Sequence, residues 1–154
     1  MWELLSYQGD NRIMGKKYYT DIRVIYADID AMGIAYHGNY IKWFEIGRTE
    51  WLRQIGFPYA LLEREGIWLP VTEVTCCYKV PAHYDDVLEI ASWADTLGGA
   101  SMVMAYEIRR KPAGELLVHG KTHHAVTGVD LKPIKLKRLR PDFYMAVVSA
   151  MNDE

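Results

Sequence analysis

The chain has 154 residues, half of them apolar and 12% aromatic, a composition that predicts one folded domain with a real core and excludes a disordered chain. Its formal net charge of −2 argues against bulk electrostatic binding of nucleic acid. There is no signal-peptide pattern, and no apolar run approaches the roughly 18 residues of a membrane span, so we expect a cytoplasmic protein.

The chain begins with residues 1–17, which show no regular period, and we assign this N-terminal extension no function. Residues 18–26 then alternate between two faces, which is typical of a β-strand. One face of this predicted strand carries Tyr18, Thr20, Ile22, Val24 and Tyr26.

A turn over residues 28–33 follows the strand, and Gly33 gives it the backbone freedom that a tight turn needs. Asn39 is a good N-cap for a helix that runs from Tyr40 to about Ile55, before Gly56 and Pro58 end it. At a helical period, one face is apolar and is expected to lie against a sheet. That face carries Tyr40, Phe44, Gly47, Trp51 and Ile55.

The rest of the chain alternates mostly as strands. Short helices are predicted over residues 57–65 and over residues 141–151 near the end of the chain. Strands are expected over residues 68–80, 87–97, 100–110 and 116–129, the second and third of these joined as a hairpin across Gly98-Gly99. One long helix with a run of long antiparallel strands predicts an α+β architecture.

The position of Asp30 is compatible with an acyl-transfer site. This carboxylate lies a few residues before the first turn of the long helix, whose amides have no intrahelical acceptors. Such amides stabilise the oxyanion that forms in acyl transfer, while the carboxylate attacks or activates a nucleophile. Asp28, two residues earlier, is interpreted as a turn former that binds local amides.

The same stretch carries a family resemblance. The run from Tyr26 to Tyr40, followed by Trp43-Phe44-Glu45 and Arg48-Thr49-Glu50, resembles the signature of hotdog-fold acyl-CoA thioesterases. The best match is the 4-hydroxybenzoyl-CoA thioesterase-like family, with its Tol–Pal-associated members. This chain departs from the family pattern at Ile29, where Thr is frequent, and at Ile34-Ala35, where Val-Val is frequent.

The resemblance implies a hotdog domain over residues 18–140, a curved antiparallel sheet wrapped around the helix, with residues 141–154 as a C-terminal segment. It implies that Asp30 is the catalytic carboxylate and that the amide of His37 polarises the thioester carbonyl. The side chain of His37 is a second candidate donor. We expect the substrate to be bound by Gly33, Tyr36, Gly38 and Tyr40.

The reaction implied is hydrolysis of an acyl-CoA to a free acid and coenzyme A, with no cofactor. A single such sheet leaves edges exposed, so a homodimer or homotetramer with the pocket at the subunit interface is expected. Glu45, on the helix, is the rival catalytic carboxylate, because some other hotdog thioesterases use that position. It is interpreted as structural and able to pair with Arg48.

No metal site is predicted. The adjacent thiols of Cys76 and Cys77 point to opposite faces of a strand and form neither a disulfide nor a metal site. His119 and His123 share a face but lie roughly 13 Å apart at 3.3 Å per residue. His124 points to the other face, so all three histidines are interpreted as structural or surface residues.

A basic run over residues 132–140 stands out in a slightly acidic chain. Its Lys135, and Arg109 at the end of a predicted strand, are candidates for binding the phosphates of coenzyme A. The run is also consistent with a solvated segment, or with a nucleic-acid protein that binds through Lys135 and Arg138. A further alternative is a non-catalytic acyl-CoA or acyl-carrier-protein binder on the same fold, which the intact Asp30 argues against.

Overall fold

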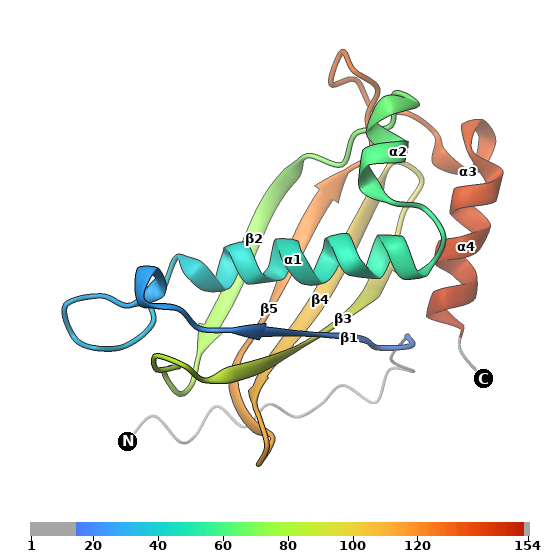
Figure 1. Ribbon diagram of the computed structural model, residues 1–154. Helices are drawn as coiled ribbons and strands as arrows, with labels where there is room; N and C mark the ends of the chain where they lie inside the picture. Colours follow the sequence, from blue (N-terminus) through green and yellow to red (C-terminus); the bar gives the residue numbers. More distant parts are fainter. Residues whose placement is uncertain (1–14, 153–154) are drawn as a thin grey trace.

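The computed structural model describes residues 15–152, so the predicted N-terminal extension lies outside the described residues except for residues 15–17. Figure 1 shows one long helix lying across a curved sheet, with two helices near the C-terminus packed at one end. The elements are β1 (Tyr18–Arg23), η1 (Tyr26–Asp28), α1 (Asn39–Gln54), α2 (Tyr59–Arg64), β2 (Val71–Tyr78), β3 (Val87–Leu97), β4 (Ser101–Arg110), β5 (Glu115–Ala125), α3 (Leu136–Leu139) and α4 (Pro141–Met151).

The five strands form one antiparallel sheet in the order β1-β3-β4-β5-β2. The predicted hairpin is confirmed, since β3 and β4 pair across Gly98-Gly99. Strands β1 and β2 form the edges, and each has a single neighbour within the described chain. The predicted α+β architecture is therefore confirmed.

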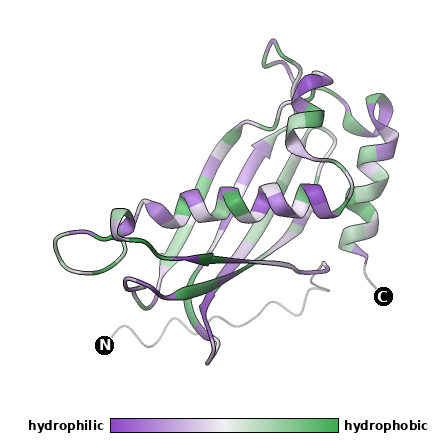
Figure 2. Ribbon diagram, viewed as in Figure 1, coloured by the Kyte–Doolittle hydropathy of each residue, from purple (hydrophilic) through white to green (hydrophobic). Residues whose placement is uncertain are grey.

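Helix α1 packs its apolar stripe onto the sheet, as its period predicts. Tyr40, Phe44, Gly47 and Trp51 are all buried, and the Phe44 ring stacks on Tyr106 of β4 with centroids 4.5 Å apart. In Figure 2 hydrophobic and hydrophilic residues alternate along α1, as expected of a helix with one face on a core and one in solvent. This packing fixes where the N-terminus of α1 lies relative to the strands.

Several element boundaries differ from the predictions. β1 ends at Arg23, and Tyr26 is 75% exposed in η1, because the chain leaves the sheet edge before that residue. β5 ends at Ala125, after which Trp68 and Thr127 form only an isolated bridge. The predicted helices over residues 57–65 and 141–151 are confirmed in α2 and α4.

The predicted N-cap at Asn39 is wrong. Asn39 is the first residue of α1, Gly38 precedes it as the cap, and no side chain caps the helix. The Asn39 side chain instead donates a hydrogen bond to the carbonyl oxygen of Asp28 at 2.8 Å, which ties the helix start to the preceding loop. No helix among residues 15–152 is long and apolar enough to cross a membrane.

We predict that Gly120→Ala destabilises the fold. A Cβ on Gly120 would lie 2.8 Å from two ring carbons of Phe44 and closer still to the Thr75 carbonyl oxygen, and a backbone atom cannot move aside easily. Overpacking of this kind costs about 1–3 kcal/mol. Urea unfolding measures the loss. Gly99→Ala is the matched control, because nothing lies within 4 Å of its added carbon, and an equal loss in both variants would contradict the packing argument.

Candidate active site

The loop between η1 and α1 carries the predicted catalytic acid, Asp30. Asp30 donates its amide to the Ile34 carbonyl at 2.9 Å, and its own carbonyl accepts from Gly33 at 3.0 Å. Gly33 has φ +79°, so the predicted need for glycine in this turn is confirmed. One carboxylate oxygen of Asp30 accepts the Met32 amide at 2.8 Å. The carboxylate forms no ion pair with any residue in the described range.

Asp28 has a different environment from Asp30, although only Ile29 separates them. It is 4% exposed, and its carboxylate accepts the Ile25 amide at 3.0 Å and the Lys42 ammonium group at 3.1 Å. Its carbonyl oxygen also accepts from the Tyr36 amide at 2.8 Å. The interpretation of Asp28 as a turn former is confirmed by these contacts, which leave Asp30 as the unpaired acid of the loop.

The start of α1 offers main-chain N–H groups. Within the described part of the chain, the amides of His37 and Gly38 have no hydrogen-bond acceptor. The carbonyl preceding the His37 amide, that of Tyr36, accepts from the Asn39 amide at 2.9 Å. Both free N–H groups lie in the stretch that the sequence assigned to an oxyanion site.

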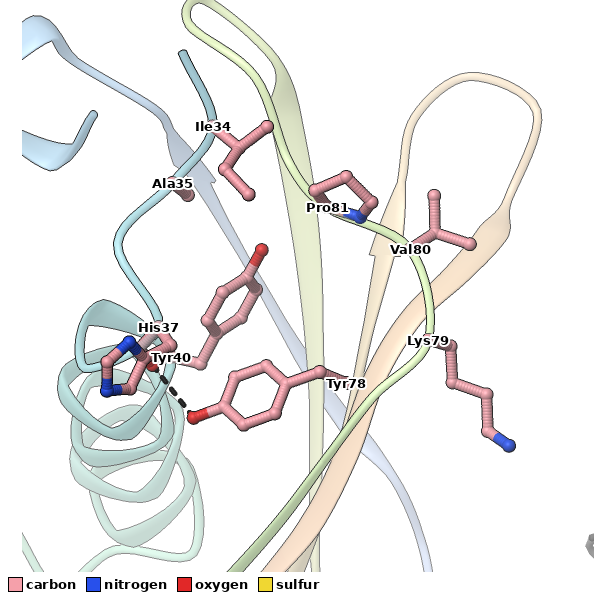
Figure 3. A pocket seen from close by; sticks show the side chains of 8 residues that line it. All are labelled: Ile34, Ala35, His37, Tyr40, Tyr78, Lys79, Val80 and Pro81. Carbon is pink, nitrogen blue, oxygen red and sulfur yellow. Dashed lines mark hydrogen bonds between the residues drawn. The ribbon is translucent and has the colours of Figure 1, made fainter. Parts of the chain in front are cut away.

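A cavity of about 270 Å³ opens beside these groups. Figure 3 shows the rings of Tyr40 and Tyr78 between the helix start and the end of β2. The hydroxyl of Tyr78 donates to the His37 carbonyl at 2.9 Å, and that of Tyr40 accepts from the Ala82 amide at 3.0 Å. The cavity is lined by Ile34, Ala35, His37, Tyr40, Tyr78, Lys79, Val80 and Pro81, so it is mainly apolar, and Asp30 is not among the lining residues.

The structure brings four of the predicted site residues together at the cavity. His37 and Tyr40 line the cavity, and Tyr36 and Gly38 lie beside them: the Tyr36 and His37 rings are 4.4 Å apart. A Cβ on Gly38 would meet the Tyr36 ring at 2.7 Å, so glycine permits this close approach. Sequence analysis missed Tyr78, because a strand pattern does not reveal that its last residue reaches the start of a distant helix.

Two predicted phosphate contacts lie elsewhere in the chain. Arg109 donates to the Gly114 carbonyl at 3.0 Å and pairs with Glu107 at 3.2 Å. Lys135 immediately precedes α3, which Figure 1 places at the opposite end of the molecule from the N-terminus of α1. Neither side chain lines the cavity of its own chain, and their role in binding coenzyme A stays a prediction.

The rival acid Glu45 lies on the exposed side of α1 and lines a different hollow, together with Lys42, Ile46, Thr49 and Glu50. The predicted pairing of Glu45 with Arg48 is absent from the ion pairs of the described residues. Arg48 donates instead to the hydroxyl of Tyr106 at 3.1 Å, beneath the helix. Glu45 is therefore separated from the apolar cavity within one chain.

Arg48 starts a buried chain of hydrogen bonds that ends at His124. Tyr106 and Thr122 hydroxyls are 2.6 Å apart, and Thr122 Oγ1 is 2.7 Å from His124 Nε2. Because the Leu69 carbonyl 2.9 Å from His124 Nδ1 only accepts, Nδ1 carries the hydrogen and Nε2 accepts. The pKa of His124 is lowered to about 4, mainly by burial and also by the charge of Arg48, against the opposing effect of the Leu69 hydrogen bond. The interpretation of His124 as structural is confirmed.

The other histidine and cysteine positions show no metal-binding arrangement. Among residues 15–152, no three His, Cys, Asp or Glu side chains lie close enough together to hold a metal ion. Cys76 is half-buried and Cys77 exposed, and both are free thiols on β2.

Comparisons with known proteins place the chain in a family. The sequence profile described as the thioesterase-like superfamily matches residues 24–147. The Bacillus subtilis protein YneP is 37% identical over 131 residues, which are 84% of this chain and 94% of that relative. The acyl-CoA thioesterase YbgC of Haemophilus influenzae is 33% identical over 115 residues, 74% of this chain and 82% of its own length.

The solved structures agree with the sequence relatives. The crystal structure of DHNA-CoA thioesterase from Staphylococcus aureus superimposes with a TM-score of 0.81 at 36% identity, covering 86% of this chain and 89% of that one. The chain therefore belongs to the thioesterase-like superfamily, and its fold is the hotdog fold that the resemblance implied. Within that superfamily it is a thioester hydrolase.

We predict that protonation of His124 makes stability depend on pH. Its folded pKa of about 4 lies below the ordinary 6.5, so the unfolded chain takes up the proton first as the pH falls. The contribution of His124 is fully present above about pH 6.5 and is lost as the pH falls toward 4, an effect on the order of 3 kcal/mol.

Urea unfolding at stepped pH checks this prediction. His124→Gln should flatten the dependence on pH in that window, and His123→Gln, a neighbour on the opposite face of β5, should retain it. A wild-type slope in the His124 variant would show that other groups cause the acid sensitivity.

Proposed function

We propose that this protein hydrolyses acyl-CoA thioesters to a free carboxylic acid and coenzyme A, with Asp30 as the catalytic carboxylate. The observation that carries the proposal is that one loop holds both an acid free of ion pairs and two amides at the start of α1 that have no acceptor. Relatives named as CoA thioesterases, at 33% and 36% identity, support coenzyme A as the leaving group.

Two routes fit the same residues. In one, an Asp30 oxygen attacks the thioester carbon, the C–S bond breaks to release the thiolate, and water then hydrolyses the mixed anhydride. In the other, Asp30 takes a proton from water, the hydroxide adds to the carbonyl, and the proton passes to the departing thiolate. In both, the amides of His37 and Gly38 bind the oxyanion. Neither route needs a metal or redox cofactor.

The acyl group would enter the cavity beside the helix start. Ile34, Ala35, Val80 and Pro81 present an apolar wall, and the Tyr40 and Tyr78 rings meet edge to face at 5.4 Å. An apolar or aromatic acyl chain suits such a lining, because its burial removes apolar surface from water. Gly33 and Tyr36 would border the entrance. The cytoplasmic location expected from the sequence stays a prediction.

We predict that Asp30→Asn lowers kcat for thiol release from acyl-CoA by about 10²- to 10⁴-fold, the range of a lost general base or nucleophile. The amide keeps the shape and an acceptor for the Met32 amide, so the fold should persist. Thiol release over a panel of acyl-CoA substrates measures the loss. Asp85→Asn, in an exposed neighbouring loop, is the control, and Glu45→Gln tests the rival acid.

Full activity in Asp30→Asn would refute the assignment, and loss in Glu45→Gln alone would transfer the role to the helix. If the wild-type protein binds acyl-CoA but releases thiol from no substrate in the panel, the non-catalytic binder is the correct alternative.

We also propose that two chains or more assemble through the β2 edge. This strand has β5 as its single neighbour, and it ends at the cavity with Tyr78. β2 and α1 also carry large apolar side chains that are exposed: Val71, Tyr78, Ile41 and Ile46. Edge pairing would cover this surface and place residues of the partner beside the cavity.

Light scattering should accordingly give a mass of at least two chains. Val71→Lys, which places a charge on the proposed edge, should lower that mass and reduce activity at low protein concentration. Val129→Lys adds the same charge at an exposed loop position and should change neither. A monomeric wild-type protein with full activity would exclude the assembly.

A further inference from the structure

The hydroxyl of Tyr78 is the one side-chain group among the described residues that holds the peptide between His37 and Gly38. It donates to the His37 carbonyl at 2.9 Å from the far end of β2, 41 residues along the chain (Figure 3). The Tyr78 ring is itself held, since it meets the Tyr40 ring at 5.4 Å and the His37 ring at 6.3 Å. The hydroxyl therefore reaches the helix start from a fixed direction.

Because the peptide bond is planar, the hydrogen bond from Tyr78 to the His37 carbonyl also affects the N–H group of Gly38. The carbonyl of His37 and the N–H of Gly38 belong to one rigid unit, so fixing the carbonyl also fixes the direction of the N–H. A hydrogen bond accepted by the carbonyl polarises the unit and strengthens its N–H as a donor. The contact acts on the Gly38 amide without touching it.

The neighbouring peptide is held in the same manner by the main chain. The Tyr36 carbonyl accepts from the Asn39 amide, and its peptide carries the N–H of His37. Both amides without acceptors are thus held through the carbonyl oxygens of their own peptides. The His37 amide is held by the helix turn alone, whereas the Gly38 amide is held by a side chain from the edge strand β2.

We propose that Tyr78 is a positioning residue, which orients and polarises the His37–Gly38 peptide so that the Gly38 N–H binds the oxyanion of the reacting thioester. This inference rests on the proposed function, because it assumes that an oxyanion forms at these amides. Tyr78 need not contact the reacting atoms. It would act in the transition state more than in the bound substrate, since the negative charge on oxygen develops only there.

Tyr78→Phe tests the proposal, because it removes the hydroxyl and keeps the ring packing. We expect kcat for thiol release to fall about 3- to 10-fold with KM unchanged, the pattern of an interaction made in the transition state. Tyr84→Phe is the matched control. Tyr84 is exposed and stacks on Tyr26 with centroids 3.8 Å apart, and its hydroxyl makes no hydrogen bond with the described residues.

A second readout separates positioning from general stability. The amide nitrogen of Gly38 shares a peptide with the carbonyl that Tyr78 binds, so its ¹⁵N resonance should move in Tyr78→Phe and stay in Tyr84→Phe. Incorporating 3-fluorotyrosine at position 78 makes the hydroxyl a stronger donor and should move the resonance in the opposite direction. If Tyr78→Phe fails to fold, the 3-fluorotyrosine protein decides the question: a moved Gly38 resonance with a raised kcat supports the proposal, and an unchanged kcat overturns it.

The outcomes distinguish this proposal from the one on which it rests. An unchanged kcat in Tyr78→Phe, with or without a moved Gly38 resonance, overturns the role of Tyr78 while an inactive Asp30→Asn leaves the proposed function standing. A raised KM at constant kcat also overturns it, because that pattern indicates a substrate contact. An active Asp30→Asn would instead refute the proposed function.

Discussion

The position of the site depends on one buried carboxylate, that of Asp28. Its side chain accepts the Ile25 amide and the Lys42 ammonium group, and its carbonyl accepts the Tyr36 amide and the Asn39 side chain. A charge that is only 4% exposed is costly unless it is paired and hydrogen-bonded, so this residue is stable only where all its partners meet. The loop and the first turn of α1 are thereby fixed together.

This arrangement explains why two acids in nearly the same place have opposite characters. The carboxylate of Asp28 already accepts hydrogen bonds from Ile25 and Lys42, so it is not available to a substrate. Asp30, two residues on, accepts a single local amide from Met32. A carboxylate without a cationic partner keeps its acceptor strength and its freedom to attack, which a nucleophile or base requires.

The sequence predicted the fold well because its signals are local and periodic. The alternation of Met102, Met104, Tyr106 and Ile108 marked the buried face of β4, and the stripe from Tyr40 to Trp51 marked that of α1. The predicted Asn39 cap failed because the Asp28 carbonyl, eleven residues back, competes for its side chain. Propensity at a helix start is a weak guide when the fold supplies another partner.

The sequence pointed to only part of the cavity region. Residues that are close together in the chain could be interpreted from the sequence, and a residue far along the chain could not. Asp30, Gly33, His37 and Gly38 lie in one continuous loop, whose residue types and spacing can be interpreted directly. Tyr78 is 41 residues away and looks like any strand residue, because its meaning depends on which helix end lies opposite the end of β2. Tertiary packing decides that, and no period in the sequence encodes it. Arg109 and Lys135 do not line the cavity of their own chain. A suitable charge does not reveal the end of the molecule on which it lies, and the role of both residues in binding coenzyme A stays a prediction.

Because Tyr78 lies on an edge strand, the proposed assembly and the proposed orientation of the Gly38 amide involve the same part of the sheet. An edge strand has ladder bonds on one side only, so it is more easily displaced than a central strand. The contact from Tyr78 to the His37 carbonyl therefore depends on one of the two strands that have a single neighbour in the sheet. In the proposed assembly, a second chain would pair with β2, hold it on both sides and shield the half-exposed Tyr78 ring. Subunit pairing would then stabilise the contact that orients the Gly38 amide, so that assembly and catalysis would depend on the same strand.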